Sequence, residues 1–147
     1  MTVGYEALTR FADGVPPDIR FGEAHAVGLG LDLEAATMSA AMAAAESLPE
    51  TTWLNVNASP AFVLAQGALL ALVKKQARRL VIEVTEHAEI QDYDAFRAAI
   101  GALGPTVGLA VDDAGAGYAS LRHILELQPA FVKIRSEERR VGKECRL

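Results

Sequence analysis

Short apolar runs alternate with longer segments of mixed polarity along this chain, and the alternation predicts strands separated by helices. The expected strands are the apolar runs at residues 2–8, 53–57, 80–84, 107–112 and 131–134. Most of these runs are apolar at nearly every position. That pattern is typical of parallel strands that are covered on both faces.

Segments with apolar residues at the spacing of a helix face lie between the expected strands. We expect four helices, which begin at Asp32, at Pro60, at Asp92 and at about Tyr118. Asp32 is expected to cap the first of them, which runs to about Leu48. Gly104 and Pro129 are expected to end the third and fourth helices, because glycine and proline commonly follow a helix C-terminus.

Strands that alternate with helices predict a parallel α/β fold, either an open doubly wound sheet or a barrel. The positions of the polar residues distinguish the two. Each expected strand carries a charged or amide residue at or near its C-terminal end, and these are Glu6, Asn57, Glu83, Asp112 and Lys133. A (β/α)8 barrel has its active site at that end of its strands, whereas an open sheet concentrates its site at one point. We therefore expect a partial (β/α)8 TIM-like barrel of roughly five parallel strands, since a complete barrel needs about 250 residues.

The composition is that of a folded domain, because 51% of the 147 residues are hydrophobic. No apolar run is long enough to span a bilayer, so we expect no membrane contact from this segment. The single cysteine, Cys145, excludes a disulfide framework and a cysteine metal site and suits a cytoplasmic setting. The net charge of −5 argues against general nucleic-acid binding, although acidic residues around a cation would suit a phosphate substrate.

The last thirteen residues, 135–147, differ from the rest of the chain. They contain five of the fourteen basic residues, and the apolar periodicity stops there. The segment resembles a read-through or adapter-derived tail, and an ordinary charged terminal helix is the alternative. We therefore expect a partial domain at 1–134 and a non-native or disordered tail at 135–147.

The polar residues at the expected strand ends are of the kind that bind hard cations. Carboxylates at Glu6, Glu83 and Asp112, with the amide of Asn57, would suit Mg²⁺ or Mn²⁺. The neighbouring Asp113 could bind a second ion. Two such ions could promote water attack on a phosphodiester.

Two basic residues could act beside these ligands. Lys133 could orient the attacking water or offset charge that develops on phosphate, and Arg10 could bind a phosphate oxygen. Enolase-type barrels also place carboxylates and a lysine on successive strands, so spacing leaves that class open. Asn57 could instead cap the helix that begins at Pro60, and Asn55 is a rival amide on the same strand.

Five motifs then narrow the choice. Residues 4–11 read Gly-Tyr-Glu-Ala-Leu-Thr-Arg-Phe and resemble the Glu-Ala-Leu signature of the EAL domain family of cyclic di-GMP phosphodiesterases. Residues 57–60 and 83–86 resemble the family's Asn-x-Ser-Pro and Glu-x-Thr-Glu elements. Residues 112–121 resemble its Asp-Asp-Phe-Gly-x-Gly-Tyr-Ser-Ser-Leu block, and residues 132–134 its lysine strand. All five occur in the family's order.

The resemblance implies a modified TIM barrel that hydrolyses cyclic di-GMP to linear 5′-phosphoguanylyl-guanosine with two Mg²⁺ or Mn²⁺ ions. It implies the metal ligands Glu6, Asn57, Glu83, Asp112 and Asp113. By the same resemblance Lys133 contacts the catalytic water, Arg10 binds a substrate phosphate and Leu8 packs against the nucleotide. Glu86 would act with Lys133 in the catalytic set by holding the loop after Asp113, through which members of the family often form homodimers.

The chain also departs from the family pattern. Ala114 replaces the usual Phe of the Asp-Asp-Phe-Gly block, and Arg135 stands where an Asp normally follows the lysine strand. The strand that precedes Glu6 in the family, a later glutamate and the last strands have no counterpart here. We therefore expect about 55–60% of a full domain, from an active parent but inactive by itself. The alternative function is a catalytically inactive cyclic di-GMP receptor or protein-interaction module.

Overall fold

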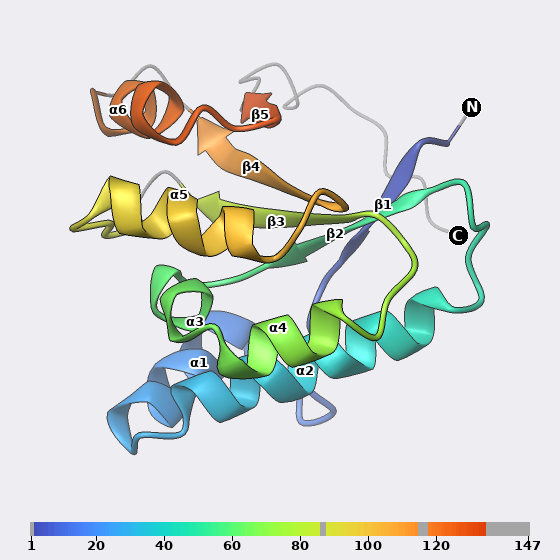
Figure 1. Cartoon of the computed structure of the whole chain (residues 1–147). Coiled ribbons are helices and arrows are strands. Elements are labelled where there is room, and N and C mark those ends of the chain that lie inside the picture. The colour runs from blue at the N-terminus through green and yellow to red at the C-terminus, as the bar shows by residue number, and fades with distance from the viewer. Residues whose placement is uncertain (1, 86–87, 115–117, 135–147) are drawn as a thin grey trace, which may run out of the picture.

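A five-stranded, wholly parallel sheet forms the centre of the protein. The computed structural model describes residues 2–85, 88–114 and 118–134. The strands are β1 (Gly4–Ala7), β2 (Trp53–Asn57), β3 (Leu80–Thr85), β4 (Val107–Ala114) and β5 (Phe131–Ile134). Their order in the sheet is β1-β2-β3-β4-β5, the order of the chain (Figure 1). An open doubly wound sheet reverses its strand order at a switch point, whereas a barrel winds in one direction. The partial barrel is therefore confirmed.

The predicted strands agree with the observed ones to within a few residues. β2 and β5 have the predicted bounds, β1 is shorter than the predicted run 2–8, and β3 and β4 extend slightly further. Each strand is joined to the next by helices, as parallel pairing requires.

In the described part of the chain six helices connect the strands, and they differ from the sequence expectations in three ways. They are α1 (Pro17–Ala26), α2 (Gly30–Ala45), α3 (Pro60–Ala65), α4 (Gly67–Val73), α5 (Tyr93–Ala102) and α6 (Tyr118–Leu127). The first helix, α1, was not predicted, because none of its residues is buried and it carries little apolar periodicity. The cap expected at Asp32 is wrong, since α2 begins at Gly30 and Asp32 lies in its first turn.

The third difference is that the helix expected from Pro60 is two helices. The chain breaks at Gln66, whose φ is +60°. The Gln66 side chain donates to the carbonyls of Val63 and Ala99, at 3.0 and 2.9 Å, and so ties the break to α5. By contrast, the helix expected to begin at Asp92 is found as α5, and the Asp92 side chain caps it by accepting from the Ala95 amide at 2.9 Å.

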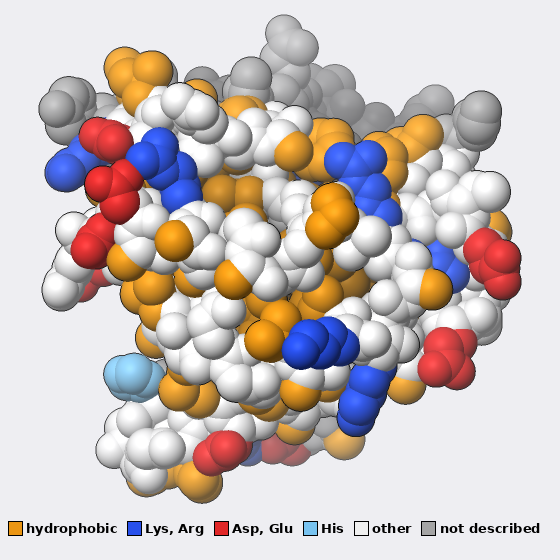
Figure 2. Space-filling model, viewed as in Figure 1, with side chains coloured by type: hydrophobic (Ala, Val, Ile, Leu, Met, Phe, Trp, Pro, Cys, Tyr) orange, Lys and Arg blue, Asp and Glu red, His pale blue; other side chains and the backbone are white. Residues whose placement is uncertain are grey.

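One face of the sheet forms the hydrophobic core. Alternate strand residues, such as Val56, Ile82 and Val111, pack with buried helix residues such as Met42 and Phe62. Helices α2, α3 and α4 lie on one side of the sheet in Figure 1. Figure 2 shows hydrophobic side chains between polar and charged ones in the same view. Fully burying a Val, Ile, Met or Phe side chain contributes about 1.5–3 kcal/mol to the stability of the fold, so this core attaches the helices to the sheet.

The other face of the sheet carries aromatic residues near the amino ends of the strands. Trp53 of β2 stacks on Phe131 of β5, with ring centroids 5.4 Å apart. The Arg79 guanidinium lies 5.8 and 5.7 Å from the two ring centroids. Gly4 of β1 lies beneath the Trp53 ring, where a Cβ atom would overlap the indole. These contacts span the sheet from its first strand to its fifth.

Among the described residues, no helix combines the length and the hydropathy that a membrane crossing needs.

Candidate metal centre

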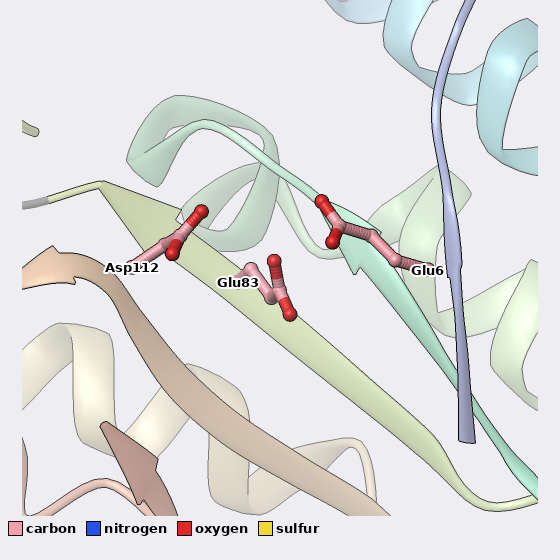
Figure 3. Close-up of side chains that lie close together, drawn as sticks. All are labelled: Glu6, Glu83 and Asp112. Atoms are coloured by element: carbon pink, nitrogen blue, oxygen red, sulfur yellow. The ribbon is translucent and has the colours of Figure 1, made fainter. Parts of the chain in front are cut away.

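Three carboxylates meet at the carboxyl ends of three strands. They belong to Glu6 of β1, Glu83 of β3 and Asp112 of β4 (Figure 3). One carboxylate oxygen from each lies within 4.8 Å of the other two. Residues separated by more than a hundred positions in the sequence are thus brought to one point.

The strand register explains this convergence. Glu6 pairs with Asn55, Asn57 pairs with Glu83, and Asp112 pairs with Thr85. Paired residues of neighbouring strands point to the same face, and so do residues two apart on one strand. All three carboxylates therefore lie on the face opposite the helix-covered core.

Lys133 of β5 joins the same cluster. Its Nζ donates to Glu6 Oε2 at 3.0 Å and lies 2.7 Å from a carboxylate oxygen of Glu83. Burial raises the pKa of the Glu83 carboxyl, and the hydrogen bond and charge of Lys133 only partly offset that effect. Burial alone would lower the pKa of the Lys133 ammonium, but its hydrogen bonds to Glu83 and Glu6 raise it overall. The two carboxylates therefore favour the charged form of Lys133.

Two asparagines of β2 lie on the same face of the sheet as this cluster, at different positions along the strand. Asn57 is exposed and lies level with Glu83 in the strand register. Asn55 lies deeper, and its Nδ2 donates to Glu83 Oε1. Its Oδ1 is buried and, within the described part of the chain, has no hydrogen-bond partner. The sequence indicated Asn55 only as the alternative amide to Asn57. Its hydrogen bond to Glu83 depends on how β2 and β3 pair, and no local motif indicates that pairing.

Asn57 does not cap the helix at Pro60, which corrects that alternative. The cap is Ser59, whose Oγ accepts from the Phe62 amide at 3.1 Å. Glu34 of α2 in turn accepts from the backbone amide and the hydroxyl of Ser59, at 2.8 and 2.6 Å. The segment after Asn57 is therefore fixed to α2, a contact for which the sequence carried no signal.

Leu8 and Arg10 follow the end of β1 that carries Glu6. Leu8 is 57% exposed, and Arg10 is also exposed. Arg10 Nη1 donates to the neighbouring Thr9 carbonyl at 2.7 Å, which leaves further N–H donors of the guanidinium for a ligand. Glu86 and the side chain of Asp113 lie outside the described residues.

The cluster suits a divalent cation on chemical grounds. Three carboxylates meet here, and within the described residues Lys133 forms ion pairs with two of them, Glu6 and Glu83. Like charges at this distance need a nearby cation or solvent. Carboxylate and amide oxygens are the ligands that Mg²⁺ and Mn²⁺ prefer, and Asn55, which hydrogen-bonds Glu83, has a buried Oδ1 without a partner among the described residues.

Solved structures of known proteins are similar to most of this chain. The manganese and cyclic di-GMP complex of BlrP1 from Klebsiella pneumoniae is 31% identical, with a TM-score of 0.73 over 90% of this chain and 36% of that one. The PaMucR phosphodiesterase in complex with c-di-GMP is 26% identical, with a TM-score of 0.71 over 90% of this chain and 61% of that one.

A curated relative is also similar to most of this chain. The blue light- and temperature-regulated antirepressor BluF of Escherichia coli (strain K12) is 28% identical over 146 residues, which cover 92% of this chain and 36% of BluF. The chain thus spans about a third of the length of BluF and of BlrP1. The sequence model of the EAL domain matches residues 1–139, and the chain belongs to the EAL domain family.

Proposed function

We propose that this site hydrolyses cyclic di-GMP to linear 5′-phosphoguanylyl-guanosine, as part of a complete domain to which residues 1–134 contribute. The observation that carries the proposal is the convergence of Glu6, Glu83 and Asp112 within 4.8 Å at the carboxyl ends of three barrel strands. The substrate is supported by family membership and by relatives solved with cyclic di-GMP.

We assign two divalent cations, Mg²⁺ or Mn²⁺, to the oxygen ligands of the cluster. Glu6, Glu83 and Asp112 would hold them, together with Asn57 and Asp113. Bound cations would supply positive charge to phosphodiester oxygens and Lewis acidity toward water. The buried position of Glu83 strengthens its attraction for a cation, because little solvent screens it.

The remaining residues would bind substrate and place charge. Lys133 keeps its proton beside Glu83 and Glu6, so its ammonium can hydrogen-bond a water or offset charge on a phosphate. Arg10 is exposed just beyond β1 and can donate to a phosphate oxygen, while the exposed Leu8 can pack against a base. Glu86 would support this set by holding the loop after Asp113.

The test compares one buried and one exposed carboxyl. In the complete natural domain that carries residues 1–134, Glu83→Gln should lower Mn²⁺-dependent hydrolysis of cyclic di-GMP by at least about 100-fold. Glu89→Gln, at an exposed position after β3, should leave the rate unchanged. Equal rates in the two variants would remove Glu83 from the mechanism.

Binding and turnover are measured separately. Calorimetry with cyclic di-GMP in Ca²⁺ and chromatography of the Mn²⁺ reaction distinguish an enzyme from a receptor, since a receptor binds the ligand and forms no linear product. For the 147-residue chain by itself we expect no detectable turnover.

Two further expectations belong to this proposal. We expect the chemistry to take place in the cytoplasm. We also expect a homodimer through the loop after Asp113, and analytical ultracentrifugation of the complete domain tests that contact.

A further inference from the structure

The amide of Asn55 is oriented by one hydrogen bond. Its Nδ2 donates to Glu83 Oε1, and that carboxylate also accepts from Lys133. Turning the amide over would face its oxygen toward the carboxylate, two acceptors with no proton between them. The Oδ1 atom therefore stays on the side away from Glu83 Oε1.

The Oδ1 atom of Asn55 is buried and lacks a hydrogen-bond donor within the part of the chain that the structure describes. A buried acceptor without a donor or cation is unfavourable, and such atoms in native proteins usually have a functional or solvent partner. Asn55 pairs with Glu6 in the strand register, so its side chain leaves the sheet on the face that carries the carboxylate cluster.

Glu83 is the carboxylate whose orientation matters most. Figure 3 draws it between Glu6 and Asp112, and its side chain is fully buried. Asn55 and Lys133 are its two side-chain partners in the described residues. Lys133 is charged and would be repelled by a cation in the cluster, whereas the neutral amide of Asn55 would not.

We propose that Asn55 is a positioning residue for the cation. Its N–H fixes the Glu83 carboxylate, and its Oδ1 becomes satisfied, directly or through a water, when a divalent cation occupies the cluster. The inference rests on the cation site proposed above. It gives β2 a role at the site through a residue that lies outside the Asn-x-Ser-Pro motif.

The test is a Mn²⁺ titration of the 147-residue chain, followed by the electron paramagnetic resonance signal of free Mn²⁺. Asn55→Ala removes both amide groups, and Asn55→Leu does the same while keeping most of the volume. Both variants should raise the Kd for Mn²⁺ by at least about tenfold. The control Gln91→Leu removes an amide from an exposed position and should leave the Kd unchanged.

A purely structural role would give a different pattern. It would lower the thermal midpoint of the metal-free chain without changing the Kd of the folded protein. A Kd within twofold of the parent value in either folded variant would overturn the proposal, and so would loss of folding in both. If the parent chain itself binds no Mn²⁺, the cation site fails; if it binds and the variants bind equally, only the role of Asn55 fails.

Discussion

Replacing Lys133 by Met should separate the stability of the metal-free cluster from its affinity for cations. The Lys133 ammonium lies 2.7 Å from Glu83 and 3.0 Å from Glu6. Met keeps much of the apolar stem of lysine and removes the charge together with its hydrogen bonds to Glu6 and Glu83. The variant therefore tests what the ammonium does between the two carboxylates.

The two ion pairs contribute unequally. Lys133 and Glu6 are 33% and 36% exposed, and an exposed pair of this kind contributes at most about 1 kcal/mol. The Glu83 side chain is 0% exposed, and stranding a buried charge costs about 3–5 kcal/mol. Because Lys133 is itself one third exposed, we take the lower end, a loss of about 3 kcal/mol for the metal-free chain. For a domain of this size that corresponds to a fall in Tm of about 6–12 °C.

Cation binding should change in the opposite direction. In the parent chain an incoming cation meets the positive charge of Lys133, and in Lys133→Met it does not. We expect the variant to bind Mn²⁺ at least about tenfold more tightly, equivalent to about 1.4 kcal/mol. Saturating Mn²⁺ should therefore raise the Tm of the variant by more than that of the parent.

Differential scanning calorimetry with and without Mn²⁺ measures both effects. Lys75→Met, at an exposed position after α4, is the matched control and should shift Tm little. Weaker Mn²⁺ binding by Lys133→Met, or an equal metal-induced rise in Tm, would refute the reasoning that the ammonium competes with a cation.

Three other predictions concern Gly4, Arg78 and the pH dependence of cation binding. Gly4→Ala should cost about 1–3 kcal/mol, because the new Cβ overlaps the Trp53 ring, and the emission spectrum of this single tryptophan should shift; an unchanged Tm and spectrum would contradict the packing. Arg78→Ala should lower the free energy of unfolding in urea by about 2 kcal/mol or more, because the guanidinium donates to the carbonyls of Ala45 and Leu48, at and just after the end of α2. A change below about 0.5 kcal/mol would contradict this role. Burial raises the pKa of Glu83 above its ordinary value of 4.5, so protons compete with Mn²⁺ at a higher pH than they would for an exposed carboxyl. Affinity should rise as pH increases through that raised pKa and then level off, and a flat profile from about pH 4.5 upward in calorimetric titrations would contradict this expectation.

The sequence was most informative where one local pattern sufficed. The apolar runs at β2 and β5 had the correct bounds. The start of α5 was predicted at Asp92, whose side chain hydrogen-bonds an amide only three residues away. The convergence of Glu6, Glu83 and Asp112 also followed from the sequence, because parallel strands deliver their carboxyl ends to one edge.

The features that the sequence did not predict depend on contacts between residues distant in the sequence. The break at Gln66 is stabilised by a carbonyl of α5, and α1 buries no residue that could mark its period. The hydrogen bond from Asn55 to Glu83 exists only because β2 and β3 pair in one particular register. A one-residue shift of that register would send every side chain of the strand to the other face, and no local motif encodes the choice.

The aromatic stack at the amino ends of the strands has a geometric consequence for the opposite end of the sheet. Trp53 and Phe131 connect β2 to β5 across the concave interior, without passing through β3 or β4. This contact between non-adjacent strands limits how far the sheet can flatten. Flattening would move Glu6 and Lys133 apart. The distance between the first and last strands at the acidic rim, where Glu6 and Lys133 meet, therefore depends in part on two rings at the amino ends of the strands.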